Sequence, residues 1–370
     1  MTDVLQGDVP QGDVPQGDVP RRGEPHGDVP RGFPDGEAAL EELLATPSAG
    51  LIADLAKLRG DLVVLGAGGK MGPSLCRLAR RGLDAAGRSQ ARVYAVSRWS
   101  DAAAAKALEA DGVRTVAFDL MDGDPAELPD ADNVVFMVGA KFGSAGAPEH
   151  AWAVNAALPD RIARRYPTAR IAAFSTGNVY PLVAAGSGGS VESDPVGPVG
   201  EYAMSCLGRE RVFTYAATAR DTPVALIRLN YAVDLRYGVL ADIGAAVYAG
   251  EPVDVTTGQA NVVWQGYANE VALRSLRHAA APFTVNLTGP ETASVRRIAA
   301  LFGESFGREA TVVGTESGSA LLSDASRCHE LFGYPDVPLR TLVAWQAEWI
   351  RRGHPLSGKA TKFQVRDGKF

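Results

Sequence analysis

Residues 65–72 read Leu-Gly-Ala-Gly-Gly-Lys-Met-Gly, and this stretch decides the fold. It follows a short apolar run typical of a buried strand and leads into helical spacing over 71–86. Gly66 permits a tight turn, Gly69 lets the backbone approach a pyrophosphate, and Gly72 lets helix and strand pack closely. Free N–H groups and the helix dipole favour phosphate there, so the stretch predicts dinucleotide binding. The alternative is a tight strand-to-helix turn without a ligand.

Strands and helices alternate along the chain beyond this loop. The pattern predicts strands at 92–97, 114–119, 133–138, 170–175 and 224–229, with helices at 71–86, 101–110, 149–166 and 201–218. This order predicts the α/β class, with a doubly wound parallel sheet covered by helices on both faces. After about residue 233 the elements become shorter and less regular. We therefore expect a smaller C-terminal lobe that binds substrate.

The two ends of the chain differ from this pattern. Gln-Gly-Asp-Val-Pro occurs three times over 6–20, and a fourth copy at 26–30 begins with His. Such a segment buries too little apolar surface to fold, which predicts a low-complexity tail. The expected organisation is that tail at 1–35, a helical segment at 36–60, a nucleotide-binding domain at 61–235, a lobe at 236–353 whose chain can return to the sheet, and a solvated tail at 354–370.

Composition excludes several classes of protein. The 370 residues are 46% hydrophobic and 22% charged, which argues against wholesale disorder. The net charge of −6 without a basic patch argues against nucleic-acid binding. No apolar run approaches the roughly 20 residues of a membrane span. Three cysteines and five histidines lack paired or metal-ligand spacing, so we expect a cytoplasmic protein with no metal, binding a small-molecule substrate.

The end of the second predicted strand bears on which nucleotide binds. The strand ends in Ser97-Arg98, and Asp101 comes only after two more residues. A carboxylate at the tip suits the ribose hydroxyl of NAD, whereas a guanidinium suits the 2′-phosphate of NADP. This favours NADP, with NAD still possible. The alternative is that Arg98 is a solvated loop residue.

From about Asp61 to Trp349 the chain resembles the extended short-chain dehydrogenase/reductase family, which includes nucleotide-sugar epimerases and dehydratases. The glycine spacing at 66–72 is one motif that carries the resemblance. The others are Asp119 after the third strand, Val138-Gly139-Ala140 after the fourth, the Ser-Thr-Gly-Asn-Val-Tyr-Pro strand end at 175–181, and Tyr202 on the following helix. The resemblance implies a Rossmann domain and a homodimer. Its cofactor site would comprise Gly66, Gly69, Lys70, Met71, Gly72, Ser97, Arg98, Asp119, Leu120, Val138, Gly139, Ala140, Lys141, Asn155, Ser175 and Tyr202. Its substrate site would include Thr176, Asn178 and Tyr231.

Two positions depart from the family pattern. The family carries Tyr-x-x-x-Lys on one helix face, where the lysine stabilises tyrosinate, but here Tyr202 is followed by Cys206. Sugar-nucleotide dehydratases carry Asp-Glu where this chain has Gly177-Asn178, so that dehydration is not expected. We hypothesise that Lys141, in the loop after the fourth strand, contacts the substrate, the cofactor or the tyrosine in place of the missing lysine. The alternative is a lysine in solvent.

The sequence predicts an NADP(H)-dependent oxidoreductase acting on a carbinol or carbonyl of a sugar-like or polyol-like molecule. Tyr202 would donate and accept the proton, and Thr176 would bind the substrate oxygen. One alternative is an epimerase that retains its NAD(P) through the cycle. Another is a catalytically weakened nucleotide-binding sensor or scaffold, because the lysine is missing.

Overall fold

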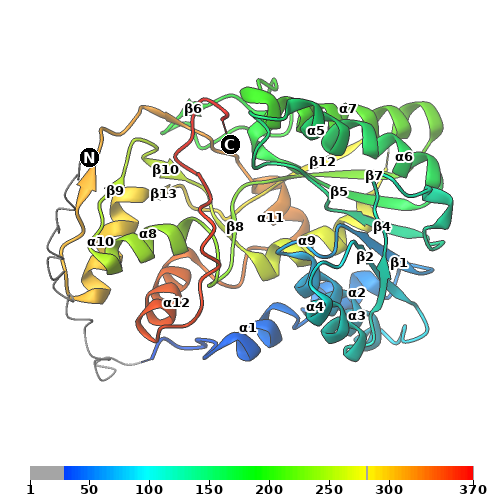
Figure 1. Ribbon diagram of the computed structural model, residues 1–370, viewed down its shortest axis with the longest axis horizontal. Coiled ribbons are helices and arrows are strands. Elements are labelled where there is room, and N and C mark those ends of the chain that lie inside the picture. The colour runs from blue at the N-terminus through cyan, green and yellow to red at the C-terminus, as the bar shows by residue number, and fades with distance from the viewer. Residues whose placement is uncertain (1–28, 281, 370) are drawn as a thin grey trace, which may run out of the picture.

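A seven-stranded parallel sheet forms the centre of the computed structural model, which describes residues 29–280 and 282–369 (Figure 1). The strand order is β12-β7-β5-β4-β1-β2-β3. The bounds are β1 Leu62–Leu65, β2 Val93–Ser97, β3 Arg114–Ala117, β4 Asn133–Phe136, β5 Arg170–Thr176, β7 Val224–Leu229 and β12 Phe283–Leu287. The predicted doubly wound sheet is confirmed. The chain reverses direction across the sheet between β1 and β4, the place where such folds bind ligands.

Helices cover both faces of this sheet. One face packs on α2, α3 and α9, and the other on α6 and α7, so each face has its own apolar core (Figure 1). The helices of this part are α2 Ala49–Leu55, α3 Gly72–Ala85, α4 Ala102–Ala110, α5 Pro148–Trp152, α6 Leu158–Arg165, α7 Gly200–Arg220 and α9 Gln265–Ser275. A π-helical turn, η2 Ala153–Ala157, joins α5 to α6. Among the described residues, no helix combines the length and apolarity that crossing a membrane requires.

The glycine loop adopts its shape for the reasons that its sequence suggests. All four residues of β1 are buried, because the strand lies inside the sheet between β4 and β2. Gly66 has a φ of 87°, which permits the turn out of the strand. A Cβ on Gly72 would lie 2.2 Å from the carbonyl oxygen of Ala67. Only glycine therefore lets α3 begin so close to the loop, and Pro73 in its first turn fits the helix start.

The C-terminal lobe is built from short elements around four helices. These are α8 Val239–Ala249, α10 Val295–Phe306, α11 Ser326–Phe332 and α12 Leu339–Arg351. Two-residue strands pair in four small sheets: β6 Val183–Ala184 with β15 Ser319–Ala320, β8 Ala232–Val233 with β11 Val263–Trp264, β9 Val253–Asp254 with β14 Val312–Val313, and β10 Gln259–Ala260 with β13 Ala293–Ser294. The chain leaves this lobe once to add β12 beside β7.

The N-terminal helix α1, Glu37–Leu44, packs on the same core as the sheet. Its Leu40 and Leu44 are fully buried, and its Glu41 forms ion pairs with Arg77 of α3 and with Arg236. The helical segment predicted at 36–60 is thus an integral layer of the fold. The predicted low-complexity tail lies, up to residue 28, outside the described residues.

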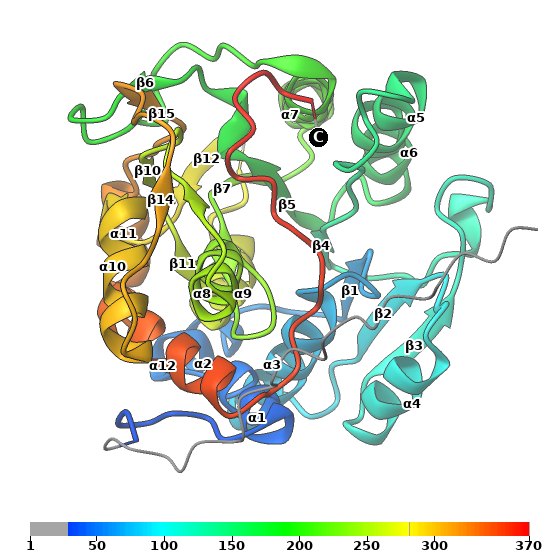
Figure 2. The same cartoon turned by 60° about the vertical axis from the view of Figure 1, so that its left-hand side comes forward.

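The C-terminal segment is not the solvated tail that its charges suggested. Thr361 and Phe363 are 4% and 2% exposed, and Gly368 packs against the backbone at Val199. The segment runs from α12 past α8 to the start of α7, across the carboxyl ends of the strands (Figure 2). We name residues 355–368 the C-terminal strap. The four basic residues of 354–370 predicted a solvent-exposed segment. Contacts with residues distant in the sequence instead hold it against the fold.

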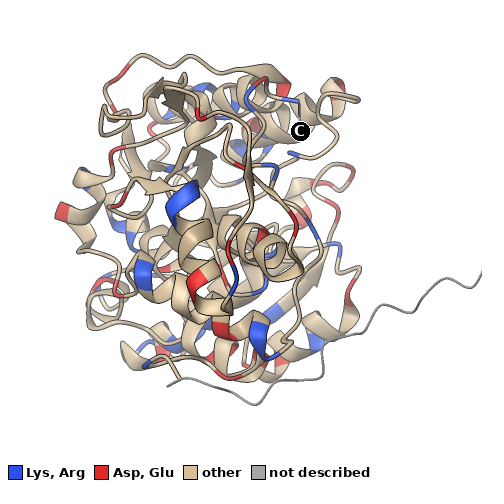
Figure 3. Ribbon diagram, turned by 90° about the vertical axis from the view of Figure 1, so that its left-hand side faces the viewer, with Lys and Arg blue, Asp and Glu red and all other residues tan. Residues whose placement is uncertain are grey.

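Charge is distributed without a dominant sign. Basic and acidic residues alternate over the face shown in Figure 3. This arrangement agrees with the small net charge of −6. A continuous basic stripe, the usual electrostatic footprint of nucleic-acid binding, is absent from that face.

Candidate active site

Two adjoining cavities lie at the carboxyl ends of the central strands. The glycine-loop cavity has a volume of about 390 Å³, and the tyrosine cavity has a volume of about 180 Å³. Tyr237 lines both of them. A dinucleotide lying across the strand ends would therefore run from the first cavity into the second.

The glycine-loop cavity fits a phosphate group. Gly68 and Gly69 form its floor, where a Cβ on Gly69 would meet only the Gly66 carbonyl, at 3.4 Å. Lys70 extends beside them, with its Nζ 2.7 Å from the centroid of the Tyr237 ring. Burial, together with repulsion by Lys359 of the strap, lowers the pKa of Lys70 to about 8. An anion bound here would relieve both effects.

The wall of this cavity at the end of β2 differs from the sequence-based expectation. Ser97, Trp99 and Asp101 line it, whereas Arg98 is exposed and lies outside the wall. Asp101 caps α4, with one carboxylate oxygen accepting from the N–H groups of Ala103 and Ala104. Its second oxygen has no hydrogen-bond partner among the described residues and is suited to accept from a ribose hydroxyl. Asp101 was not predicted as a cofactor residue, because two residues separate it from the predicted strand end at Ser97-Arg98.

The other predicted cofactor residues are not among those that line the two cavities. This group comprises Gly66, Met71, Gly72, Asp119, Leu120, Val138, Gly139, Ala140 and Asn155. The carboxylate of Asp119 accepts from the backbone N–H of Met121 at 2.8 Å, which shapes the loop after β3. Val138 lies against Gly66, since a Cβ on that glycine would be 3.0 Å from the valine side chain. These two contacts help to fix the loops after β3 and β1.

Asn155 clasps the loop after β4 to helix α7. Its Oδ1 accepts from the Ala140 N–H, and its Nδ2 donates to the Ala140 carbonyl and to Ser205 Oγ, each at 2.9 Å. Arg209 donates to the same Oδ1 at 2.7 Å and to the carbonyl of Phe174 at 2.7 Å. The fully buried amide thus joins three elements, and the π-helical turn η2 carries it. A fixed loop after β4 in turn positions Lys141.

The tyrosine cavity gathers the predicted catalytic residues. Its walls include Lys141, Ser175, Thr176, Asn178, Tyr202, Asn230, Tyr231 and Thr361. Burial raises the pKa of Tyr202, and the Cys206 side chain adds to this by accepting a hydrogen bond from the phenol. Thr176 is the other hydrogen-bonding neighbour of that phenol, and the charge of Arg209 acts in the opposite direction. Tyr202 is therefore held as a neutral proton donor.

Cys206 occupies the family's lysine position as a buried thiol. It is 0% exposed, and burial raises its pKa, so it is neutral at pH 7. A neutral thiol buried beside the tyrosine is typical of an inert packing cysteine rather than of a nucleophile. Among the described residues, no cluster of His, Cys, Asp and Glu could hold a metal ion.

Lys141 lies on the other side of Tyr202. Its Nζ is 5.9 Å from the centroid of the tyrosine ring and donates to the carbonyl oxygen of Thr361 at 3.4 Å. Burial lowers the pKa of this lysine to about 8, so most of the population is charged at pH 7. The hypothesis that Lys141 approaches Tyr202 agrees with this geometry. The alternative of a lysine in solvent disagrees with this burial.

Sequence reasoning missed several residues of the site. Arg209 lies seven residues after Tyr202, two turns along the same helix face, and this spacing could have identified it. Asn230, the residue after β7, also lines the tyrosine cavity. Tyr231 adopts a φ of 38°, an uncommon conformation for an aromatic residue and one that clusters at ligand sites. Thr361 had no sequence signal, because only the fold brings the strap here.

A buried polar network supports the cavity from behind. Arg228 of β7 forms an ion pair with Glu210 of α7 at 2.8 Å, with both side chains under 10% exposed. Glu210 also accepts from Ser175 Oγ at 2.6 Å, and Arg228 donates to the Tyr180 hydroxyl at 2.6 Å. That hydroxyl donates to Asn286 of β12. The network links three strand ends to the helix that carries Tyr202.

Residues 62–233 match the sequence profile of the NAD dependent epimerase/dehydratase family. This range contains the glycine loop, Thr176, Tyr202 and Cys206. None of the curated protein sequences matches the chain significantly.

Solved structures share the fold at low sequence identity. UDP-glucuronic acid 4-epimerase from Bacillus cereus in complex with NAD has a TM-score of 0.67 at 17% identity, covering 80% of this chain and 99% of its own. MoeE5 in complex with UDP-glucose and NAD has a TM-score of 0.63 at 22% identity, covering 80% and 99%. UDP-glucose 4-epimerase from Thermotoga maritima with UDP-glucose has a TM-score of 0.61 at 15% identity, covering 79% and 99%. These likenesses establish the fold.

Proposed function

The chain belongs to the NAD dependent epimerase/dehydratase family, and on this premise we propose that it oxidises and re-reduces a carbinol of a sugar-like substrate with a retained NAD. The observation that carries the proposal is the meeting of two cavities at Tyr237: one over the glycine loop, and one around Tyr202, Thr176 and Lys141. A dinucleotide in the first places its reactive end in the second. When bound, NAD supplies a hydride acceptor that becomes the hydride donor for the return step.

The chain's own residues handle the proton. In the return step, the Tyr202 hydroxyl donates its proton to the substrate oxygen as hydride reaches the carbon, and the neutral phenol suits this role. In the oxidation step, which comes first, the substrate hydroxyl gives its proton to Tyr202, which must therefore be in the phenolate form at the start of the cycle. The charge of Arg209, which lowers the pKa of Tyr202, and the nearby charge of Lys141 favour this form.

NAD is the nucleotide that the cavity favours. Asp101 lines the wall near the end of β2, and a carboxylate there suits a ribose hydroxyl while repelling a 2′-phosphate. Arg98 supports the second candidate, an exchanging NADP(H)-dependent oxidoreductase on a sugar-like or polyol-like substrate, if its exposed guanidinium turns toward the cavity. Affinities measured for both nucleotides on one preparation separate the two. NAD binding at least tenfold tighter supports the proposal, and the reverse preference overturns it.

The decisive experiment identifies the nucleotide released from the purified, denatured protein. A retained NAD at one per chain supports the epimerase cycle, whereas an empty protein that exchanges NADP(H) supports the oxidoreductase. Tyr202→Phe then tests for turnover, because only the hydroxyl group is removed. Turnover of a substrate by the wild type and a loss of about a thousandfold in the variant, with nucleotide affinity within threefold, support catalysis. Unchanged behaviour supports the third possibility, a sensor or scaffold.

We also propose that the protein works as a homodimer, as the family resemblance implies. Trp152 of α5 and Tyr215 of α7 are 41% and 61% exposed on the two helices that would pair. Analytical ultracentrifugation of the full chain tests this arrangement. A single monomeric species at micromolar concentration contradicts it.

A further inference from the structure

We propose that the C-terminal strap is the outer wall of the substrate site and restricts the substrate to a monosaccharide-sized polyhydroxy compound without a nucleotide group. This inference rests on the proposed function, since it concerns the substrate of the same site. It separates this chain from the neighbours described above, whose complexes hold UDP-sugars.

The strap is fixed at both of its ends. Near its start, the N–H of Ser357 donates to the carbonyl of Arg236 at 2.8 Å. Near its end, the Arg366 guanidinium donates to the carbonyl of Ser319 at 2.7 Å and to its Oγ at 2.9 Å. Gly368 then packs so tightly that a Cβ would lie 2.3 Å from the Val199 carbonyl.

The middle of the strap is fixed over the tyrosine cavity itself. Thr361 donates to the Asp242 carboxylate from its N–H at 2.8 Å and from its hydroxyl at 2.6 Å. Its carbonyl accepts from Lys141, and Phe363 is 2% exposed. Polar and apolar anchors thus alternate along the segment, which is the pattern of a built wall rather than of a loose tail.

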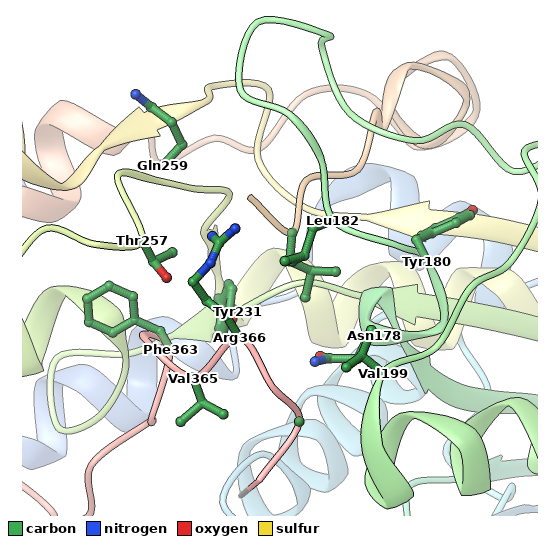
Figure 4. Close-up of a pocket in the computed structure, with 12 residues that line it drawn as sticks. Asn178, Tyr180, Leu182, Val199, Tyr231, Thr257, Gln259, Phe363, Val365 and Arg366 are labelled. Carbon is green, nitrogen blue, oxygen red and sulfur yellow. The ribbon is translucent and has the colours of Figure 1, made fainter. Parts of the chain in front are cut away.

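The strap fills the groove through which a larger substrate would extend. Figure 4 shows Phe363 beside Thr257 of the lobe, and Arg366 extending between Thr257 and Leu182. The pocket that these residues line has a volume of about 30 Å³, which is room for no more than a few water molecules. Asn178 and Tyr231 line this space as well as the tyrosine cavity, so it is the direct continuation of that cavity.

The volume that remains sets the size of the substrate. The tyrosine cavity holds about 180 Å³ and must admit the reactive end of the dinucleotide as well. Pockets that bind drug-sized ligands have volumes of about 300–1,000 Å³, and a nucleotide-sugar is at least of that size class. With the strap in place, a nucleoside diphosphate therefore has no room beyond the reacting sugar. A compound of about six carbons is small enough for the space beside the reacting carbon.

The chemistry of the walls indicates a polyhydroxy compound. Hydroxyl and amide side chains line the tyrosine cavity, together with the amine of Lys141, and no carboxylate is among the residues of its wall. Asn230 lines the cavity, although its Oδ1 is buried against Gly177. Hydroxyl, amide and amine groups such as those of this wall are the groups with which the hydroxyls of a polyhydroxy compound form hydrogen bonds.

Ligand-observed NMR on the full-length, NAD-loaded protein tests the proposal. The probes are UDP, UDP-glucose and UDP-glucuronic acid on one side, and free hexoses, hexuronates and hexitols on the other. We expect saturation transfer to at least one free sugar compound. We expect none to the three uridine nucleotides at a concentration of 1 mM, which means that each of them binds with a Kd weaker than about 1 mM. Micromolar binding of any of the three, or binding of no free sugar compound, overturns the proposal.

A loosened strap provides the second measurement. In Phe363→Ala/Arg366→Ala, we expect UDP-glucose binding to appear and affinity for the free sugar to fall about tenfold, with NAD affinity within twofold of wild type. Lys369→Ala, beyond the strap and exposed, is the matched control and should behave as wild type. A double variant that folds, binds NAD and still excludes UDP-glucose shows that the strap is not the barrier. Failure to bind NAD in the wild type would instead contradict the proposed function itself.

Discussion

Asn230 occupies the space that a side chain at Gly177 would need. A Cβ on Gly177 would lie 1.6 Å from Asn230 Oδ1 and 2.6 Å from its Cγ. The two residues end neighbouring strands, β5 and β7, at the edge of the tyrosine cavity. The absence of the dehydratase acid at this position is therefore built into the packing, because an aspartate there would require the asparagine to move.

We predict that Gly177→Ala destabilises the protein by about 1–3 kcal/mol, since the added methyl overpacks a closed site. Asn230→Ala in the same chain should recover most of this loss by removing the clashing amide. Urea unfolding of both single variants and the double variant gives the coupling energy. Additive effects, with a coupling near zero, would show that the two positions do not share this space.

Lys141→Met should reduce turnover by about 10- to 100-fold while leaving the free energy of unfolding unchanged or slightly higher. The positive charge near Tyr202 is lost, but burial of that charge is costly, as the lowering of its pKa to about 8 shows. Lys141→Arg keeps the charge and should recover part of the rate. Steady-state kinetics with the identified substrate, compared with Lys369→Met as a surface control, measures the effect. Equal rates for Lys141→Met and wild type contradict the assigned role.

NAD affinity should weaken about tenfold between pH 7 and pH 9. The pKa of Lys70 is about 8 in the free protein, so at pH 9 only about a tenth of the molecules carry the cation beside the glycine loop. Bound phosphate favours the charged form, so binding above pH 8 takes up a proton. Calorimetric titrations across this range test the dependence. Lys70→Arg should remove it, because arginine stays charged, and a flat profile for the wild type excludes Lys70 as a phosphate ligand.

Glu210→Gln should lower the free energy of unfolding by about 3–5 kcal/mol, because it leaves the buried Arg228 without its countercharge. The exposed pair of Arg297 and Glu304 offers a matched control, and Glu304→Gln should cost under about 1 kcal/mol. Chemical denaturation at pH 7 compares them. Similar losses for both variants would mean that burial does not make the Glu210–Arg228 pair special.

Much of the fold could be predicted from the sequence. The β1 run, the glycines at 66, 69 and 72, and the alternation up to β7 follow from local rules of burial and periodicity, and each predicted strand overlaps an observed one. Residues that one element places together were predicted as well. Thr176 is the last residue of β5, and Tyr202 and Cys206 share a helix face, so these placements needed no distant contact.

Other features depend on contacts between distant parts of the chain. Lys141 reaches Tyr202 only because Asn155 clasps the loop after β4, and Asp101 reaches the glycine-loop cavity because its helix begins beside the Gly68 turn. Neither relation leaves a mark in local composition. Hydrogen bonds between residues far apart in the chain form only once the sheet has assembled.

What the sequence by itself determined is the sheet, the glycine loop and the helix that carries Tyr202, because period and spacing act within a few residues. The tertiary structure alone decided the size of the substrate site. The strap's three basic residues indicated a solvated segment, yet Thr361 lies 119 residues from its partner Asp242, and Lys141 lies 220 residues from the carbonyl it meets. Whether a segment is tail or wall depends on what it packs against, and only the folded chain supplies that surface.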